Sequence, residues 1–170
     1  MCRIKEKTFN ISELRSTLGV FPTCVAVVTA APEAQRPVGI TINSFQSISL
    51  KPALVGWCID GGAASFQAFA RCSHFSISVL AASQAAIAKR FATRGADKFD
   101  GIPQGGPREP LIPGAAAWFR CLLYRQIPLG DHLMLVGQVE ELGAASGDTL
   151  LFAGGHFGTA GSGGDVVRAA

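Results

Sequence analysis

The chain has 170 residues, of which 48% are hydrophobic and only 16% are charged, and its formal net charge at pH 7 is +3. The basic residues form no stripe, so we expect no nucleic-acid partner. This length suits one domain with a buried core, and we expect a single domain over residues 1–170, with a core at about 14–158 and a flexible tail at 159–170. The low charged fraction indicates that some surface is covered, most simply in a homodimer.

The cysteines and the start of the chain bear on its compartment. None of the five cysteines belongs to a Cys-x-x-Cys pair, and their odd number argues against a closed set of disulfides. The first residues are polar and charged, unlike a secretory signal, and no apolar run reaches the ~20 residues that a membrane helix needs. The three histidines lack the spacing of metal ligands. We therefore expect a cytoplasmic protein with no membrane span and no metal.

The first predicted element is a helix that begins after Asn10 and ends at Gly19. Asn10 can cap this helix, with Glu13 three residues on in a capping-box arrangement. Its apolar residues recur at helical spacing and form one face: Ile11, Leu14 and Leu18.

Two further helices and several strands are predicted along the rest of the chain. Ser65 can cap a short helix through Arg71, and Ser83 a longer one that ends near Phe91. Strands are expected at 24–30, 38–43, 54–59, 75–80, 117–127, 133–142 and 150–153. A tight turn at Gly130-Asp131-His132 joins the two longest. Many strands with few helices predict an antiparallel barrel, closed or nearly so.

The stretch from Val38 to Ser49 holds a dense set of short polar side chains where a strand ends. Hydroxyls and an amide in such a place can offer several hydrogen bonds within a few ångströms, which suits a phosphate group or the rim of a flat heteroaromatic ring. The alternative is a plain strand end and turn, because Ser and Asn are common in turns. The residues in question are Thr41, Asn43, Ser44, Ser47 and Ser49.

Collinear segments of the chain share a known pattern. They are Phe21-Pro22-Thr23 before 25–29, Thr41 to Phe45, Ser47 to Pro52, Phe75 to Leu80 with Gln84 and Phe91-Ala92, and Gly130-Asp131-His132 with Val136 to Val139. Together they resemble the flavin reductase-like family, the small reductases of two-component flavin monooxygenases. The resemblance covers roughly Leu14 to Gly158 and implies an FMN-binding split barrel: a mainly β fold, built as an antiparallel split β-barrel with a few flanking helices.

The resemblance also implies which residues contact flavin. The segment with Thr41, Asn43 and Ser44 would hold the ribityl chain and phosphate. The backbone of the next strand would offer N–H donors to the pyrimidine edge, where fixed dipoles stabilise the negative charge of the reduced ring; Ser49 is equally compatible with an outward strand position. The implied flavin contacts of both segments are Thr41, Ile42, Asn43, Ser44, Ser47 and Ser49.

A third group of implied contacts lies on the helix that follows Ser83. The N-terminus of a helix is a natural anion site, so Ser83 and Gln84 are expected near a phosphate, with Arg90 or Lys89 as a cationic partner. The alternative for the two basic residues is a solvated helix face.

His132 is the sharpest single prediction for catalysis. A histidine after Gly-Asp at a strand-to-strand turn matches the family position associated with the nicotinamide cofactor; the alternative is a turn histidine beside Asp131. Phe157, in the glycine-flanked turn near the end, is expected to form an aromatic wall for the stacked rings. The chain departs from the family at Gly154 and Phe157, where Arg and Tyr are usual, at Cys24 in place of glycine, and at Arg120 in place of an acidic residue.

The leading hypothesis is an enzyme, a homodimeric NAD(P)H-dependent flavin reductase. NADH or NADPH would reduce FMN or FAD by hydride transfer between stacked rings, and the reduced flavin would pass to a separate flavin-dependent monooxygenase or to oxygen. Two alternatives stay open at this stage: a flavin-binding electron carrier or storage protein without nicotinamide turnover, and a barrel that binds no flavin and serves as an assembly subunit.

Overall fold

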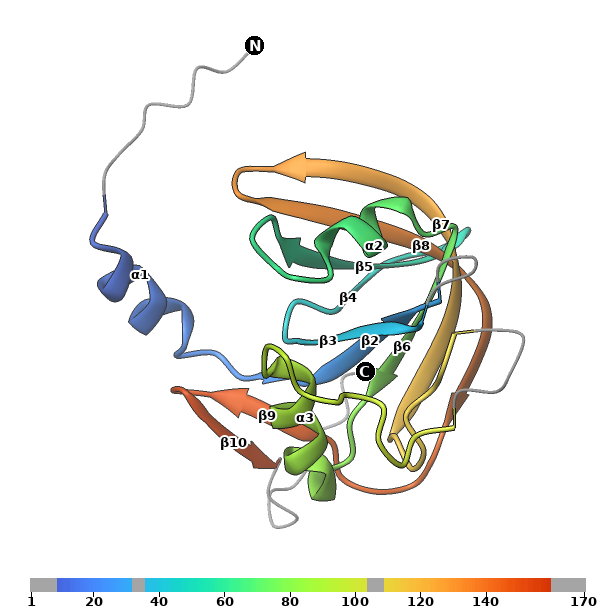
Figure 1. Cartoon of the computed structure of the whole chain (residues 1–170). Helices are drawn as coiled ribbons and strands as arrows, with labels where there is room; N and C mark the ends of the chain where they lie inside the picture. Colours follow the sequence, from blue (N-terminus) through green and yellow to red (C-terminus); the bar gives the residue numbers. More distant parts are fainter. Residues whose placement is uncertain (1–8, 32–35, 104–108, 160–170) are drawn as a thin grey trace.

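The computed structural model describes residues 9–31, 36–103 and 109–159, which form two antiparallel sheets and a few helices (Figure 1). The strands of the larger sheet are β2 (Ala26–Ala30), β3 (Val38–Ile42), β4 (Gln46–Leu50), β5 (Ala53–Asp60), β6 (His74–Val79), β7 (Ala117–Leu129) and β8 (His132–Ala144). The smaller sheet contains β1 (Thr23–Cys24), β9 (Leu150–Ala153) and β10 (His156–Thr159). The helices are α1 (Ile11–Leu18), α2 (Phe66–Arg71), the short 3-10 helix η1 (Ala82–Gln84) and α3 (Ala85–Ala92).

The larger sheet has the strand order β3-β2-β6-β7-β8-β5-β4 and curls into an open barrel. Its two end strands, β3 and β4, are consecutive in the chain, so the connection at 43–45 brings the two edges of the sheet together. Ser44 fixes this connection, because its Oγ donates to the carbonyl oxygen of Cys58 on β5 (3.1 Å) and accepts from the Cys58 N–H (3.0 Å). Within the described residues β3 and β4 do not pair, and the predicted antiparallel split barrel is confirmed.

The run predicted as one strand at 24–30 is two strands, because the chain passes from one sheet to the other at Val25. The Val25 N–H donates to the carbonyl oxygen of Leu150 (3.0 Å), and its own carbonyl accepts from the Leu80 N–H (2.9 Å). The other predicted strands are confirmed, with ends that differ by at most two residues. β10 forms where only a glycine-rich turn was expected, and residues 160–170 of the predicted tail lie outside the described residues.

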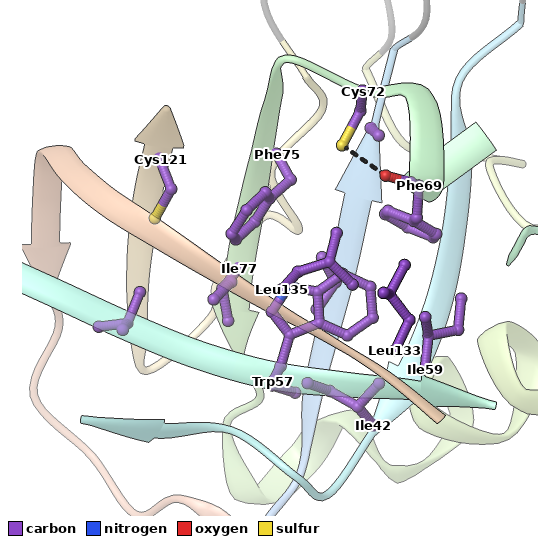
Figure 2. Close-up of a cluster of buried hydrophobic side chains, with 14 residues drawn as sticks. Ile42, Trp57, Ile59, Phe69, Cys72, Phe75, Ile77, Cys121, Leu133 and Leu135 are labelled. Atoms are coloured by element: carbon purple, nitrogen blue, oxygen red, sulfur yellow. Dashed lines mark hydrogen bonds between the residues drawn. The ribbon is translucent and has the colours of Figure 1, made fainter. Parts of the chain in front are cut away.

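The barrel interior is filled by large side chains around Trp57 of β5 (Figure 2). The Trp57 ring makes edge contacts with Phe69 of α2 and Phe75 of β6, with ring centroids 4.9 and 5.9 Å apart. All three side chains are fully buried, and burial of an apolar side chain of this kind stabilises a fold by about 1.5–3 kcal/mol. Gly137 on β8 leaves room for this packing, because a Cβ there would lie 2.5 Å from the Phe75 ring.

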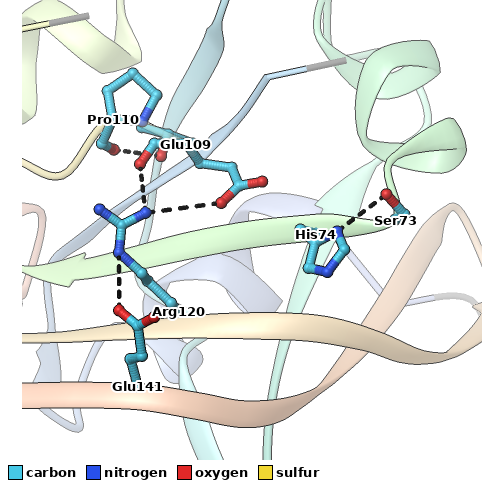
Figure 3. A network of polar contacts seen from close by, with 7 residues as sticks. Ser73, His74, Glu109, Pro110, Arg120 and Glu141 are labelled. Carbon is cyan, nitrogen blue, oxygen red and sulfur yellow. Dashed lines mark hydrogen bonds and ion pairs between the residues drawn. The ribbon is translucent and has the colours of Figure 1, made fainter. Parts of the chain in front are cut away.

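A polar network around Arg120 fixes the segment that precedes β7 (Figure 3). The Arg120 guanidinium donates to the carbonyl oxygen of Glu109 (3.1 Å) and pairs with the carboxylates of Glu109 (3.9 Å) and Glu141 (3.5 Å). The hydroxyl of Thr29 on β2 donates to the carbonyl oxygen of Pro110 (2.6 Å). The arginine that departs from the family pattern therefore anchors this segment to the strands beneath it.

Helix α1 is confirmed, with an apolar face that stays exposed. Asn10 Oδ1 accepts from the Ser12 N–H (2.9 Å), and Gly19 ends the helix. No side chain of α1 is buried, and the helix projects from the barrel in Figure 1. Its apolar residues keep exposed fractions of 69% (Ile11), 45% (Leu14) and 53% (Leu18).

The other two predicted helices are present, and Ser65 precedes α2 as expected, but neither serine caps a helix as predicted. Ser65 makes no side-chain capping hydrogen bond, and Ser83 lies inside η1 instead of preceding α3. Among the helices of the described residues, none has the length and apolar character needed to cross a membrane.

Candidate active site

Strand β3 and helix α3 run antiparallel beside each other, and this arrangement sets the geometry of the candidate site. The hydroxyl of Thr41, near the end of β3, donates to the carbonyl oxygen of Ala88 (2.7 Å). At the start of β3, Gly39 lies against Phe91, since a Cβ at Gly39 would be 2.5 Å from the ring. The N-terminus of α3 therefore lies toward the Asn43 end of β3, and its C-terminus toward the Gly39 end.

A cleft of about 730 Å³ opens beside Asn43, and we call it the Asn43 cleft. This volume is in the range of small-molecule sites. The end of α1, strand β9, the 43–46 segment and β5 all contribute to its lining. The lining residues are Arg15, Leu18, Gly19, Phe21, Thr23, Asn43, Ser44, Phe45, Gln46, Cys58, Phe152 and Gly155.

The residues predicted to contact flavin where β3 ends take different positions relative to this cleft. Asn43 and Ser44 line it, whereas Thr41 and Ile42 do not. Within the described part of the chain, the Asn43 side chain has no hydrogen-bond partner, so its amide is available to a ligand. The Ser44 and Thr41 hydroxyls already bond backbone groups of β5 and α3, and Ile42 points into the barrel core. Of these three residues Ser44 alone lines the cleft as described, and it would contact a ligand mainly through its backbone.

Ser47 and Ser49 lie on β4, the end strand of the larger sheet. Ser47 is exposed, and Ser49 Oγ accepts from the Lys51 N–H (3.2 Å) in the turn that follows. Among the described strands, β4 pairs only with β5. Its outer edge therefore presents backbone N–H and C=O groups that have no partner in the sheet.

The residues predicted around α3 are divided between its two ends. Ser83 is exposed at the Asn43 end. The side-chain amide of Gln84 is held by two backbone contacts, accepting from the Ala81 N–H (2.9 Å) and donating to the carbonyl oxygen of Pro113 (2.7 Å). Arg90 lies in the last turn of α3 and donates to a backbone carbonyl oxygen of the following loop (2.6 Å). Neither Ser83 nor Arg90 lines the Asn43 cleft.

His132 begins β8 at the tip of the long hairpin, outside the cleft lining. Its Nδ1 lies 2.6 Å from Asp131 Oδ1, and this hydrogen bond and the imidazole charge lower the pKa of the Asp131 carboxyl. His132 pairs with Asp60, and Cys58 is two residues away on the same strand. Alternate residues of a strand share a face, so His132 and Cys58 face the same side of the sheet, about 7 Å apart along it.

Phe157 packs behind the cleft. It lies opposite Phe152 in the β9–β10 pairing, and the two rings meet at a centroid distance of 5.7 Å. Phe152 lines the Asn43 cleft and Phe157 does not. Phe157, the residue predicted as an aromatic wall, is therefore not part of the lining itself and packs against the ring that is.

Sequence reasoning missed Arg15 as well as Phe152. Arg15 is the one charged residue that the described lining of the Asn43 cleft contains. It reaches the cleft because α1 ends against the β9–β10 turn, where the Gly154 N–H donates to the carbonyl oxygen of Gly19 (2.8 Å). No local pattern signals a contact between segments so far apart in the chain. Phe152 reaches the cleft through its pairing with Thr23, and the uniformly apolar sequence of β9 gives no local signal for this position.

Comparison with known proteins places this chain and its fold in a family. The chain is 41% identical over 152 residues to an FMN reductase (NADH), SmoA, of Agrobacterium fabrum, covering 88% of this chain and 86% of the relative. It is 38% identical over 161 residues to the reductase component of the flavin-dependent trigonelline monooxygenase of Acinetobacter baylyi, covering 93% of this chain but only 52%, about half, of that protein.

A solved structure agrees with the sequence matches. The NADH:FAD oxidoreductase SgcE6 of Streptomyces globisporus, solved with NAD and FAD fragments, superposes with a TM-score of 0.82 at 35% identity, covering 91% of this chain and 94% of the other. The model of the flavin reductase like domain matches residues 18–161. The chain belongs to the flavin reductase-like domain family.

Proposed function

We propose that this protein is an NAD(P)H:flavin oxidoreductase that transfers a hydride from a nicotinamide to FMN or FAD and supplies the reduced flavin to a separate flavin-dependent monooxygenase. The observation that carries the proposal is the Asn43 cleft, which is lined in part by the segment that the resemblance assigns to flavin. The relatives named as an FMN reductase (NADH) and as a monooxygenase reductase component support the same activity.

The chemistry of the Asn43 cleft fits a flavin. Phe21, Phe45 and Phe152 supply apolar surface for a flat ring. The Asn43 amide can both donate and accept, and the outer edge of β4 offers backbone N–H groups to the polar edge of the ring. A bound flavin would supply a ring that accepts a hydride from a nicotinamide. The guanidinium of Arg15 would stabilise either the flavin phosphate or the negative charge of the reduced ring.

We assign the nicotinamide contact to His132. Its Nδ1 is held by Asp131, so the ring is oriented and Nε2 stays available to a ligand. His132 shares a sheet face with Cys58, which lines the Asn43 cleft. A nicotinamide lying over the cleft would therefore lie within reach of this imidazole, which would position it for hydride transfer without transferring a proton.

The exposed face of α1 supports a homodimer as the active form. Apolar side chains continue beyond this helix, with exposed fractions of 80% for Val20 and 56% for Phe21. A second copy of the chain would cover this face, and about 800 Å² on each partner is typical of a stable interface. Sedimentation analysis of the protein and of a Leu14→Glu variant tests this; a monomeric wild-type protein contradicts it.

The cysteines support work in a reducing compartment such as the cytoplasm. Cys24, Cys58, Cys72 and Cys121 all have free thiols, and free thiols persist where disulfides are kept reduced. Recovery of the native protein only in an oxidising compartment after cell fractionation would contradict this proposal.

Anaerobic turnover tests the activity itself. Purified protein is mixed with excess FMN or FAD and with NADH or NADPH, and the flavin absorbance is followed. Catalytic bleaching of the excess flavin is expected for at least one pair. A stable spectrum with tightly bound flavin would contradict the reductase and support a flavin carrier, and failure to bind either flavin would contradict both.

A further inference from the structure

The segment 109–115, which we call the strap, crosses the outer face of the larger sheet on buried polar side chains. Its first two carbonyl oxygens accept hydrogen bonds from Arg120 on β7 (3.1 Å) and from Thr29 on β2 (2.6 Å). Strand β6 lies between these two strands, and the Oγ of Ser78 on β6 accepts from the Ile112 N–H of the strap (3.1 Å). The strap is therefore tied to three neighbouring strands.

Ser76 on β6 lies under the strap and has a hydroxyl that these contacts do not use. It pairs with Thr29 on one side and with Arg120 on the other. Residues directly opposite each other in antiparallel strands share a face of the sheet, so the Ser76 hydroxyl points toward the strap. The side chain is fully buried, and its Oγ has no hydrogen-bond partner within the described residues. A buried hydroxyl in this state costs stability unless a ligand bonds it.

Glu109, the first residue of the strap, brings a second unpartnered oxygen to the same layer. The residue is only 8% exposed, and its Oε2 accepts no hydrogen bond within the described part of the chain. Arg120 Nη1 lies 3.9 Å from this oxygen (Figure 3), which is close enough for charge pairing but too far for a hydrogen bond. Because Arg120 already compensates the carboxylate charge, the place suits a neutral ligand better than a cation.

We propose that an internal water molecule binds under the strap and bridges the Ser76 hydroxyl and the Glu109 carboxylate. Water is a neutral ligand that can donate to a carboxylate and accept from a hydroxyl, and internal waters typically bond buried polar groups that have no other partner. The bridge adds to the contacts that hold the strap on the sheet. The strap in turn carries Pro113, whose carbonyl oxygen accepts from Gln84 Nε2 (2.7 Å) just before α3, so the water helps to position the start of that helix.

The sign of the stability change in Ser76→Ala tests the proposal. If water bonds the hydroxyl, the substitution removes one hydrogen bond of the bridge, and Tm should fall. If the hydroxyl has no partner, the substitution removes an unsatisfied buried group, and Tm should stay the same or rise. Ser78→Ala is the matched control on the same strand and face, and it should lower Tm because its hydroxyl has a partner. A Tm of Ser76→Ala at or above that of the wild type would overturn the proposal.

Magnetic relaxation dispersion of the water oxygen nucleus detects the bridge itself, because internal waters with long residence times contribute to its amplitude. Ser76→Val places a larger side chain without a hydroxyl in the space of the water, so the amplitude should fall below that of the wild type. An unchanged amplitude in folded Ser76→Val would overturn the proposal. Both measurements use the protein without flavin or nicotinamide, so their failure is separate from failure of the reductase activity.

Discussion

The two ends of β3 carry clefts of similar size and opposite chemical character. At the Asn43 end the described lining is largely apolar, with Arg15 as its one charged side chain. At the Gly39 end a second cleft, of about 640 Å³, has three cations (Arg36, Arg94 and Lys98) and one acid (Asp97) in its described lining. A flat ring gains from apolar walls and a few fixed polar groups, whereas a multiply charged anion needs open cations. One strand therefore separates a cleft with largely apolar walls from a cleft with a cationic lining.

Helix α3 packs on β3 between the two clefts. Of the substitutions considered, Gly39→Ala should have the largest effect, because it disturbs this packing. The added Cβ would lie 2.5 Å from the fully buried Phe91 ring. Overpacking of this kind costs about 1–3 kcal/mol, which lowers Tm by roughly 2–4 °C per kcal/mol in a chain of this size. Thermal unfolding of the variant gives the value.

Gly158→Ala is the matched control for that substitution. Gly158 has nothing within 4 Å of the position of its Cβ and no positive φ. We expect its Tm to stay near that of the wild type. Equal Tm values for the two variants would contradict close packing of α3 at the Gly39 end.

Removal of the single charge from the Asn43 cleft should give the next largest effect. Arg15→Gln keeps a helix-forming side chain and removes the guanidinium, so we expect flavin to bind about 10–100-fold more weakly, as for loss of a charged hydrogen bond. Quenching of flavin fluorescence measures the dissociation constant. Arg71→Gln, an exposed arginine on α2 outside the cleft, serves as control, and equal affinities of the two variants would exclude Arg15 from the site.

Asn43→Ala should weaken flavin binding less, by about 2–10-fold, because it removes neutral hydrogen bonds worth about 0.5–1.5 kcal/mol. The Asn43 side chain has no partner within the described chain, so stability should not change. Fluorescence titration and thermal unfolding, run together, check both expectations. A large loss of stability with unchanged flavin affinity would make Asn43 a structural turn residue.

The smallest expected effect belongs to His132, which lies outside the cleft lining. His132→Ala should raise KM for the nicotinamide by about 2–5-fold, as for loss of one exposed hydrogen bond, and leave the flavin dissociation constant unchanged. Steady-state kinetics with varied NADH or NADPH and fixed flavin separate the two constants. Unchanged nicotinamide kinetics would contradict the assignment of the nicotinamide contact to His132.

The barrel was predictable in part because strands such as β3 and β6 alternate in sequence, while β5 is an apolar run that ends at a turn signal. β10 was not predictable, since its glycines read as a turn and only pairing with β9 makes them a strand.

The candidate site was predictable in part. Asn43 and Ser44 line the cleft as expected, but Arg15 and Phe152 enter it through contacts between distant segments. Gln84 was predicted to contact a ligand, but the oxygen and the nitrogen of its amide both form hydrogen bonds with backbone groups. Sequence identifies residue types that suit a ligand, but only the fold decides which of their polar atoms stay available.

Flavin binding at the Asn43 cleft is tested most directly by the alkylation of Cys58, which lines it. Burial raises the pKa of the Cys58 thiol, and burial beside Glu109 raises the pKa of Cys72 to about 12, so iodoacetamide near pH 8.5 should modify Cys58 slowly and Cys72 hardly at all in the folded protein. The rate at each cysteine is followed by mass spectrometry with and without saturating FMN. We predict that FMN slows alkylation of Cys58 and leaves Cys72 unchanged; an unchanged rate at Cys58 while FMN is bound would contradict a flavin site in this cleft.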